Sequence, residues 1–221
     1  MNAEEKAFCE RVTVAGVHEA KFHTFEYVET ILREGIPGDF VECGVFCGGH
    51  AAIASYVFKK WGVTDRKIHL FDSFRGIPKA GPKDCADVHA TYGTSTGAME
   101  TSGKCAVGIS ELYNFFKGWE VTTEYLVCHP GWFQDVMESE AKQIDKIAFL
   151  RVDVDLYDST KICYQNLYSK VVKGGVVVDD DWGMPSDDPG PACIAAAIES
   201  LGFKPNVLAV PGHFTTCFWR I

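Results

Sequence analysis

Two apolar segments of this chain run directly into aspartates. In the first, IAFLRVDVDLYDST (147–160), an apolar run is followed by an arginine and then by Asp153 and Asp155. In the second, GGVVVDDDW (174–182), three valines are followed by three consecutive aspartates. Short apolar runs of this kind are typical of buried strands, and carboxylates at the end of a buried strand are costly unless something pairs with them. If the two strands are neighbours, their acids crowd one edge of a sheet, where a bound cation is the simplest counter-charge.

The residue types in this acidic cluster favour a hard metal ion. Aspartate oxygens are ligands for magnesium, manganese or calcium rather than for zinc. Because both strands end in acid where the crevice of an α/β sheet is expected, we expect Asp153, Asp180 and Asp181 to bind the metal. Helix N-caps and solvated strand ends are the alternative, since aspartate is common at both positions. That alternative is preferred for three other acids: Asp155, Asp158 and Asp179.

The first half of the chain alternates between helical and strand patterns. Residues 18–34 carry apolar side chains at helical spacing and predict a helix. The strand DFVEC (39–43) follows, then a glycine-bearing turn, a helix to about Trp61 and a second strand that ends at Asp72. This order is the opening of a Rossmann-like unit, in which ligands lie beyond the carboxyl ends of the strands. Glu42 and Asp72 would then face that crevice.

The glycine-bearing turn, GVFCGG (44–49), discriminates between candidate ligands. A dinucleotide-binding turn has the pattern G-x-G-x-x-G, with glycine where the backbone approaches the pyrophosphate. Here Phe46 and Cys47 occupy the middle, which argues against a pyrophosphate. S-adenosylmethionine has no phosphate, and its amino group and ribose hydroxyls can donate to carboxylates such as Glu42 and Asp72. The alternative is a tight turn without a ligand, with Asp72 capping a neighbouring loop.

The central part of the chain predicts a long loop and then another strand-to-helix turn. Residues 75–107 are rich in Gly, Pro, Ser, Thr and Lys, and a loop of this length in a compact domain is usually functional or mobile. We interpret it as a lid, with a solvated linker as the alternative. A helix near 109–116 and the strand EYLVCH then lead to Gly131 and Trp132. Trp132 is a candidate to stack on an adenine, although an aromatic residue at such a turn is more often only packed.

The chain closes with two strand-like runs, NVLAV and HFTTCFWRI, joined by a Pro-Gly turn. This pattern predicts a terminal hairpin. A hairpin appended to alternating strands and helices is unusual for a dehydrogenase sheet. It suits a methyltransferase sheet, whose last strand runs antiparallel.

Composition narrows the class of protein further. The 221 residues are 47% hydrophobic, which is ample for one α/β domain over residues 1–221. The formal net charge of -9 argues against nucleic acid and acidic membranes as partners. The start has no signal-peptide pattern and no run is long enough to span a bilayer, so a cytoplasmic location is expected. The nine scattered cysteines form no CxxC pair and are expected to be reduced, mostly buried thiols.

Six segments together resemble the macrocin O-methyltransferase family. They are GDFVECGVFCGGHA, HLFDSFRGIP, GWFQDVM, IAFLRVDVDLYDST, NLYSKVVKGGVVVDDDW and the closing FWR, in colinear order over roughly residues 35–221. The resemblance implies a Rossmann-like class I methyltransferase fold, with a mostly parallel seven-stranded sheet, an antiparallel C-terminal hairpin and an N-terminal helical extension over 1–37. It also implies S-adenosylmethionine, a divalent metal (usually Mg²⁺), a polyhydroxylated small-molecule substrate and, as a family-level expectation, a homodimer.

The resemblance assigns roles to individual positions. Three residues would line the methionine end of the cofactor: Glu42, Gly44 and Val45. Asp72 and Ser73 would hold the ribose and its surroundings, and Gly131 with Trp132 would lie near the adenine. Asp153, Asp180 and Asp181 match the metal-binding aspartates, and Asp153 is the favoured catalytic base. Cys47 and His50 depart from the family pattern, which usually has an arginine and a small residue there.

The predicted activity is metal-assisted transfer of a methyl group from S-adenosylmethionine to a hydroxyl of a sugar or other vicinal-diol molecule. A catechol-type substrate is the first alternative, but the lysine that serves as base in catechol enzymes is replaced by Leu156. A cofactor-binding scaffold without transfer activity is the second, and the three retained aspartates speak against it. A nicotinamide-dependent reductase is disfavoured by the turn at 44–49 and by the terminal hairpin.

Overall fold

The structure, a computed structural model, describes residues 1–14, 20–84, 102–182, 192–210 and 216–221. Seven strands form its centre: β1 Asp39–Cys43, β2 Ile68–Asp72, β3 Leu126–Pro130, β4 Ile147–Val152, β5 Val171–Asp179, β6 Leu208–Ala209 and β7 Cys217–Arg220. The α-helices are α1 Ala3–Arg11, α2 Ala20–Arg33, α3 Gly49–Lys60, α4 Ile109–Gly118, α5 Phe133–Glu140, α6 Tyr157–Leu167 and α7 Ala192–Leu201. Two short 3-10 turns, Ala141–Gln143 and Tyr168–Lys170, follow α5 and α6.

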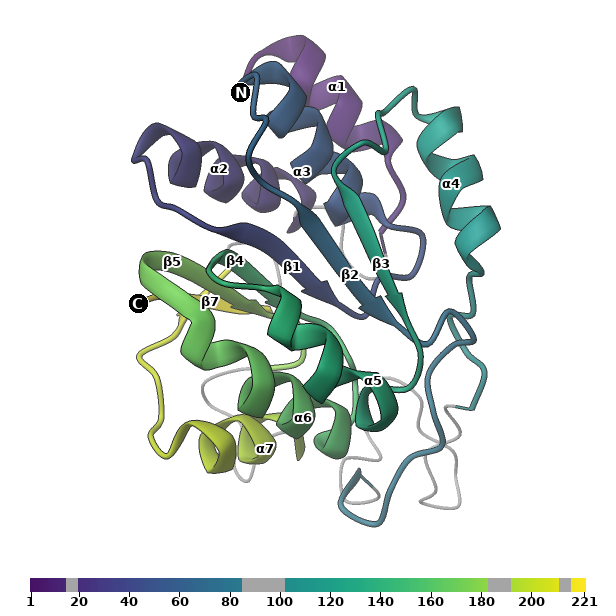
Figure 1. Ribbon diagram of the computed structural model, residues 1–221, viewed down its shortest axis with the longest axis vertical. Coiled ribbons are helices and arrows are strands. Elements are labelled where there is room, and N and C mark those ends of the chain that lie inside the picture. Colours follow the sequence, from purple (N-terminus) through teal and green to yellow (C-terminus); the bar gives the residue numbers. More distant parts are fainter. Residues whose placement is uncertain (15–19, 85–101, 183–191, 211–215) are drawn as a thin grey trace.

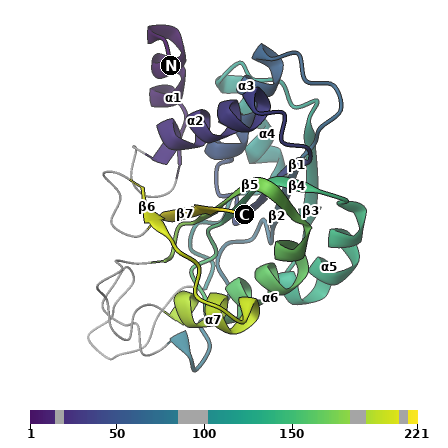
Figure 2. The same ribbon diagram turned by 90° about the vertical axis from the view of Figure 1, so that its left-hand side faces the viewer.

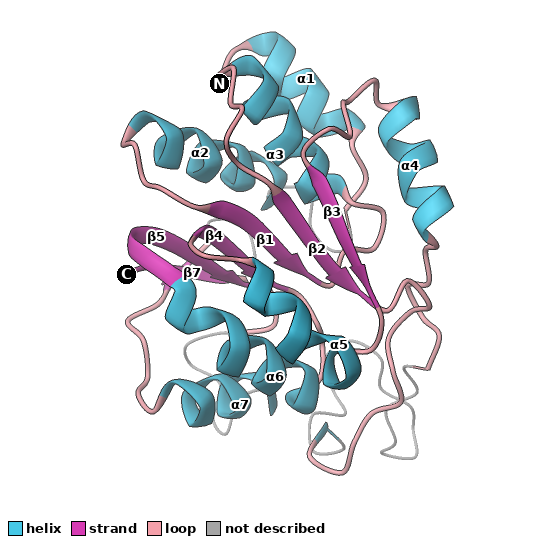
Figure 3. Cartoon of the chain, viewed as in Figure 1, coloured by secondary structure: helices cyan, strands magenta, loops and turns pink. Residues whose placement is uncertain are grey.

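The strands form one sheet in the order β3-β2-β1-β4-β5-β7-β6. The first five pair in parallel, and β7 pairs antiparallel with both β5 and β6. The parallel strands therefore end at the same edge, as the arrowheads in Figure 3 show. Chain order reverses between β1 and β4, which is the switch point where α/β sheets bind ligands. The predicted mostly parallel sheet with an antiparallel C-terminal hairpin is confirmed; Figure 2 shows β6 and β7 beside β5 at the edge of the sheet.

Helices cover both faces of the sheet and give three layers (Figure 1). Side chains of α1 to α4 bury one face, where Phe40 of β1 and Phe149 of β4 stack with ring centroids 4.8 Å apart. Side chains of α5 to α7 bury the other face, against Leu150 and Val177. Successive strand residues point to opposite faces, so the continuous apolar runs of β4 and β5 supply both layers at once.

The N-terminal segment packs on the first of these faces. The helix predicted at 18–34 is α2, whose Phe25, Val28 and Ile31 are fully buried against the sheet. The preceding helix α1 is tied to α3 by the ion pair of Glu5 with Lys60, at 2.6 Å. This segment therefore forms part of the α1–α4 layer.

The middle of the predicted lid lies outside the described residues, because 85–101 are not described. The structure describes the two ends of this segment, and backbone hydrogen bonds join them. The N–H of Ile77 donates to the carbonyl of Lys104, and the N–H of Gly103 donates to the carbonyl of Ile77. Asp84 then accepts a hydrogen bond from the backbone N–H of Tyr157, at the start of α6. The lid function stays a prediction.

The cysteines and the helices of the described residues bear on two predictions drawn from the sequence. Six of the eight described cysteines are buried, as expected for core residues. No helix within the described ranges is both long enough and apolar enough to cross a membrane.

Candidate active site

Backbone hydrogen bonds continue past the strand ends and bring the predicted site residues into one row. The donors are the amides of Gly131, Gly44, Asp153 and Asp180, and their acceptors are the carbonyls of Asp72, Phe71, Cys43 and Val152, at 2.9 to 3.0 Å. The row follows the order of the sheet, from β3 across β2, β1 and β4 to β5. The structure thus gathers the residues assigned separately to cofactor and metal along one carboxyl edge.

Glycine is required at position 44 by the close approach of β1 to β4. Gly44 has a φ of +80°, a left-handed conformation, and a Cβ added there would lie 1.7 Å from the carbonyl oxygen of Asp153. Phe46, two residues later, is also left-handed, with a φ of +48°. The turn therefore wraps tightly over the strand ends, with Cys47 buried in the core and His50 hydrogen-bonded to Thr24 of α2 at 2.8 Å.

The carboxylate of Asp72 accepts hydrogen bonds from two neighbouring turns. Oδ2 accepts from the backbone N–H of Val45 at 2.7 Å, and Oδ1 accepts from the N–H of Phe74 at 2.7 Å. Burial raises the pKa of Asp72, although these backbone donors lower it. The loop-capping alternative considered for Asp72 is therefore observed. Because an ionised carboxylate offers about four acceptor sites, this capping leaves room for ligand hydroxyls as well.

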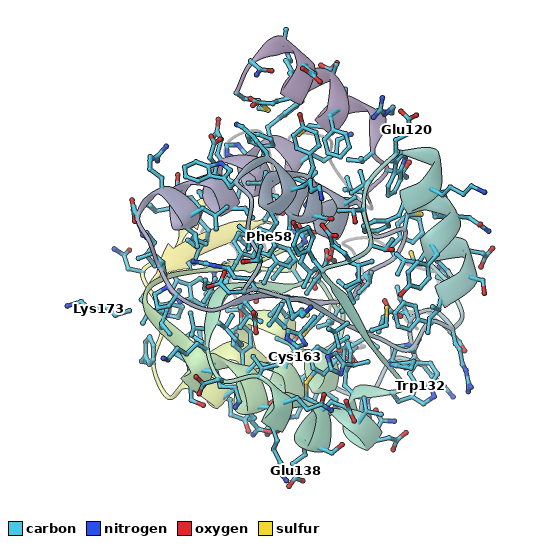
Figure 4. The ribbon with its side chains drawn as sticks, turned by 45° about the horizontal axis from the view of Figure 1, so that its top comes forward. Phe58, Glu120, Trp132, Glu138, Cys163 and Lys173 are labelled. Carbon is cyan, nitrogen blue, oxygen red and sulfur yellow. The ribbon has the colours of Figure 1, made fainter. Side chains whose placement is uncertain are left out.

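The remaining predicted cofactor residues lie beside Asp72. Ser73 donates from Oγ to the carbonyl of Gly76 at 2.8 Å and so closes the turn after β2. Gly131 has a φ of +148°, and an added Cβ would lie 2.5 Å from Val136. Trp132 is the N-cap residue of α5 and is half-buried; Figure 4 shows it at the rim of the molecule. Its accessible position leaves it able to contact a ligand.

A buried guanidinium lies at the centre of the acidic cluster. Arg151 is 1% exposed, and its Nη2 donates to Asp153 Oδ2 at 3.0 Å and to Asp180 Oδ1 at 2.7 Å. Asp180 Oδ1 also accepts from Thr216 Oγ1 at 2.7 Å. On the other side, Arg151 Nε lies 3.7 Å from Oε1 of the buried Glu42, which is an ion pair but too long for a hydrogen bond. The counter-charge predicted from the sequence was a bound cation, and the protein supplies a cation of its own, the guanidinium of Arg151.

Two of the predicted metal ligands keep one oxygen open. Asp181 Oδ2 accepts from the backbone N–H groups of Val154 and Asp155, at 2.9 and 2.8 Å. Its Oδ1, like Oδ1 of Asp153, receives no hydrogen bond within the described part of the chain. Each of these acids is thus held by one oxygen and presents the other at the strand edge.

The acids of this edge oppose one another's ionisation. Burial, then the charge of Asp180, raises the pKa of Asp153; burial, then the charge of Asp155, raises that of Asp181. Burial raises the pKa of Glu42 to about 8, against the attraction of Arg151. The pKa of Arg151 is nevertheless raised, because the surrounding carboxylates outweigh its burial. The site therefore has more carboxyl groups than one guanidinium can balance in their ionised forms, and a further cation would favour their ionisation.

The acids of this edge meet part of the requirements of a metal site. The donor chemistry fits, since Asp153 and Asp181 offer open carboxylate oxygens of the kind that hard divalent cations prefer. Within the described ranges, however, no three His, Cys, Asp or Glu side chains converge into a ready metal-binding group. Arg151 accounts for part of this, because it draws Asp153 and Asp180 onto its guanidinium. Metal binding by these aspartates therefore stays a prediction.

Comparison with known proteins gives the family. The model of the macrocin-O-methyltransferase (TylF) family matches residues 12–194. The chain belongs to this family. A Streptomyces olivaceus protein named as an 8-demethyl-8-(2,3-dimethoxy-alpha-L-rhamnosyl)-tetracenomycin-C 4'-O-methyltransferase is 34% identical over 196 residues, which are 87% of this chain and 69% of that protein. The demethyldecarbamoylnovobiocin O-methyltransferase of Streptomyces niveus is 35% identical over 71% of this chain and 57% of its own length.

Solved structures agree with the macrocin-O-methyltransferase assignment. The O-methyltransferase NovP superposes with a TM-score of 0.75 at 27% identity, covering 98% of this chain and 87% of NovP. An O-methyltransferase from Bacillus cereus in complex with SAH shares the fold, with a TM-score of 0.55 at 10% identity. The predicted family, class I fold and enzyme class, an S-adenosylmethionine-dependent O-methyltransferase, are therefore confirmed.

For this macrocin-O-methyltransferase family member we expected three acids, Asp155, Asp158 and Asp179, to be helix caps or solvated strand ends, and this was wrong for Asp179. Asp179 is neither a helix cap nor a solvated strand end: it is 1% exposed and accepts a hydrogen bond from Tyr164 Oη at 2.6 Å. The cause is its register on β5, which turns the side chain towards α6. Asp155 is half-buried in a left-handed conformation, φ +61°, and is not the N-cap of α6, which is Leu156. Asp158 lies exposed in the first turn of α6, as expected of an acid near a helix N-terminus.

Sequence analysis missed three members of the site: Arg151, Thr216 and Tyr164. Only Arg151 carried a usable signal. An arginine inside an apolar run predicted to be buried must find carboxylate partners, and the chain places two acids at the end of a neighbouring strand. Thr216 and Tyr164 lie in segments whose contact with the acids depends on tertiary packing alone.

Proposed function

We propose that this methyltransferase acts on a hydroxyl of a sugar or other vicinal-diol small molecule, with assistance from Mg²⁺ or another hard divalent cation. The observation that carries the proposal is the pair of open oxygens, Oδ1 of Asp153 and Oδ1 of Asp181, at the strand edge beside the β1–α3 turn. Open carboxylate oxygens in that place are suited to a hydroxyl proton or a cation.

The cofactor would occupy the β1 to β3 part of the edge. S-adenosylmethionine supplies a methyl group already activated on a positively charged sulfur. Glu42 supports its placement, because its buried Oε2 has no hydrogen-bond partner in the described part of the chain and an ammonium group would supply a donor. Gly44 and Val45 would lie along the methionine end, Asp72 and Ser73 at the ribose, and Gly131 with Trp132 at the adenine.

The chain must then orient the acceptor hydroxyl and remove its proton. A sugar hydroxyl is a poor acid, and a carboxylate of ordinary pKa does not deprotonate it efficiently. A divalent cation held by Asp153, Asp180 and Asp181 would lower the pKa of a bound hydroxyl, and a shift of roughly five units corresponds to about 7 kcal/mol. Asp153 is the candidate base, because its Oδ1 is open and its other oxygen is anchored.

The names of relatives support a glycosidic acceptor. One curated relative is named as a methyltransferase of a rhamnosyl-tetracenomycin, and another, from Micromonospora griseorubida, as mycinamicin III 3''-O-methyltransferase. A catechol acceptor is less suited, because Leu156 is an aliphatic side chain with 3% exposure where catechol enzymes have a lysine base. A homodimer remains part of the proposal, to be checked by sedimentation.

The experiment is transfer of labelled methyl from S-adenosylmethionine into a panel of glycosides and catechols, with Mg²⁺ and with a chelator. Mg²⁺-dependent labelling of glycosides is the expected result. Labelling that persists in chelator would refute metal assistance, and labelling confined to catechols would refute the sugar acceptor. If the wild-type protein does not bind S-adenosylhomocysteine, the cofactor placement itself is refuted.

A further inference from the structure

Arg151 occupies a position that neither the family match nor the proposed reaction assigns. It lies on β4 between Glu42 of β1 and Val178 of β5 in the strand register, on the sheet face covered by α2. Its side chain is 1% exposed, whereas Asp153 and Asp180, its partners, keep 19% and 13% exposure. A fully buried cation thus lies directly beneath two acids that reach the surface of the site.

The hydrogen bonds of Arg151 to the two aspartates come from one nitrogen. Nη2 donates to Asp153 Oδ2, two residues further along the same strand, and to Asp180 Oδ1, which follows the neighbouring strand. Thr216 fixes the same oxygen of Asp180 from a third direction. The orientations of the two carboxylates are therefore coupled through a single donor atom.

A purely stabilising role accounts poorly for this arrangement. Burying an ion pair costs desolvation that its attraction often only offsets, so buried pairs are weak sources of net stability. Arg151 Nε and Glu42 Oε2 are both buried, and neither has a hydrogen-bond partner among the residues that the structure describes. A group selected only for stability would be expected to satisfy these atoms, since nearly all buried polar groups are paired in native proteins. The unsatisfied atoms lie next to the ligand edge, where a functional constraint is the physical reason to tolerate them.

We propose that Arg151 is the positioning residue of the acidic edge. It holds one oxygen of Asp153 and one of Asp180, and thereby leaves Oδ1 of Asp153 oriented for the acceptor hydroxyl or its cation. Arg151 does not itself touch the reacting atoms. This inference rests on the proposed function for its kinetic consequence, but the coupling of Arg151 to Asp180 is a property of the protein alone.

The kinetic test compares Arg151→Met and Arg151→Lys with a control, Arg220→Met. Arg220 lies on the same sheet, in β7, and its ion pair with Glu34 is exposed. Misplacing a catalytic group by about 1 Å costs on the order of 100-fold in rate. We expect kcat to fall by about that factor in Arg151→Met, with the KM for S-adenosylmethionine within about threefold of wild type. Arg151→Lys should recover part of kcat, and Arg220→Met should keep all of it.

A structural measurement separates this inference from the proposed function. Melting temperatures of the cofactor-free Arg151→Lys, Asp180→Asn and double variants should be non-additive, because each change weakens the same hydrogen bond and the double variant cannot lose it twice. Additive shifts would overturn the positioning role whether or not the wild-type chain methylates any tested acceptor. If Arg151→Met does not fold, Arg151→Lys decides the kinetic test: wild-type kcat in that folded variant overturns the proposal. Absence of methyl transfer by the wild type, with non-additive melting, would refute only the proposed function.

Discussion

Replacing Gly44 by alanine should displace the end of β4 from the β1–α3 turn. Two effects act together: the left-handed backbone, φ +80°, and a Cβ placed 1.7 Å from the carbonyl oxygen of Asp153. Left-handed backbone costs a non-glycine residue about 1 to 2 kcal/mol, and overpacking of a well-packed site costs about 1 to 3 kcal/mol. Because the clashing atom belongs to backbone, it cannot move aside as a flexible side chain would. We expect a total loss of about 2 to 5 kcal/mol.

A matched control separates the two effects. Gly62 has a similar left-handed φ, +65°, but an added Cβ there meets nothing within 4 Å. Gly62→Ala should therefore lose only the backbone contribution of about 1 to 2 kcal/mol. For a chain of this size each kcal/mol shifts the melting temperature by about 2 to 4 °C, so calorimetry should find Gly44→Ala melting several degrees below Gly62→Ala.

The same variant should also affect catalysis, because Asp153 is the residue displaced. If folded Gly44→Ala protein is recovered at low temperature, its methyl transfer should be impaired, whereas Gly62→Ala should be fully active. Equal melting temperatures for the two variants would refute the reasoning, since they would show that the close approach at Asp153 carries no energetic consequence.

Four further predictions concern separate sites. Asp72→Ala should weaken S-adenosylhomocysteine binding by about 1 to 3 kcal/mol and loosen the capped turns, and unchanged calorimetric affinity would contradict the ribose placement. Asp180→Asn should sharply reduce turnover at limiting Mg²⁺ while cofactor affinity stays nearly intact; equal turnover would remove the metal model. Lys60→Met should lower stability at neutral pH by about 1 kcal/mol, a modest figure because the Lys60 side chain is 38% exposed. The hydrogen bond from Lys60 lowers the pKa of Glu5. The stability that Lys60 contributes is therefore present above the ordinary glutamate pKa of about 4.3 and is lost as the pH falls below it. The melting temperatures of variant and wild type should converge in acid, and a difference that persists at pH 2 would count against the ion pair. Finally, Cys105 should be alkylated first among the described cysteines, since it alone among them is exposed. Mass spectrometry would map the labelled positions, and faster labelling of a buried cysteine would contradict this prediction by showing that the core opens readily.

Much of the site could be predicted from sequence because it depends on local order along the chain. The apolar runs of β4 and β5 and the acids that follow them are contiguous, and parallel strands deliver their ends to one edge. The glycine-bearing turn and Asp72 follow strands in the same way. These features are enough to predict that Asp153 and Asp180 lie next to each other.

Tertiary structure decided which partner each acid has. Asp180 bonds to Arg151 and Thr216, 29 and 36 positions away, and Asp179 bonds to Tyr164 on the opposite face of the sheet. These pairings depend on strand register, since a shift of one residue exchanges the faces to which side chains point. Strand periodicity predicts alternation but not which acid meets the buried arginine. The sequence by itself therefore determined that carboxylates gather at this edge, and only packing determined that Arg151 holds two of them.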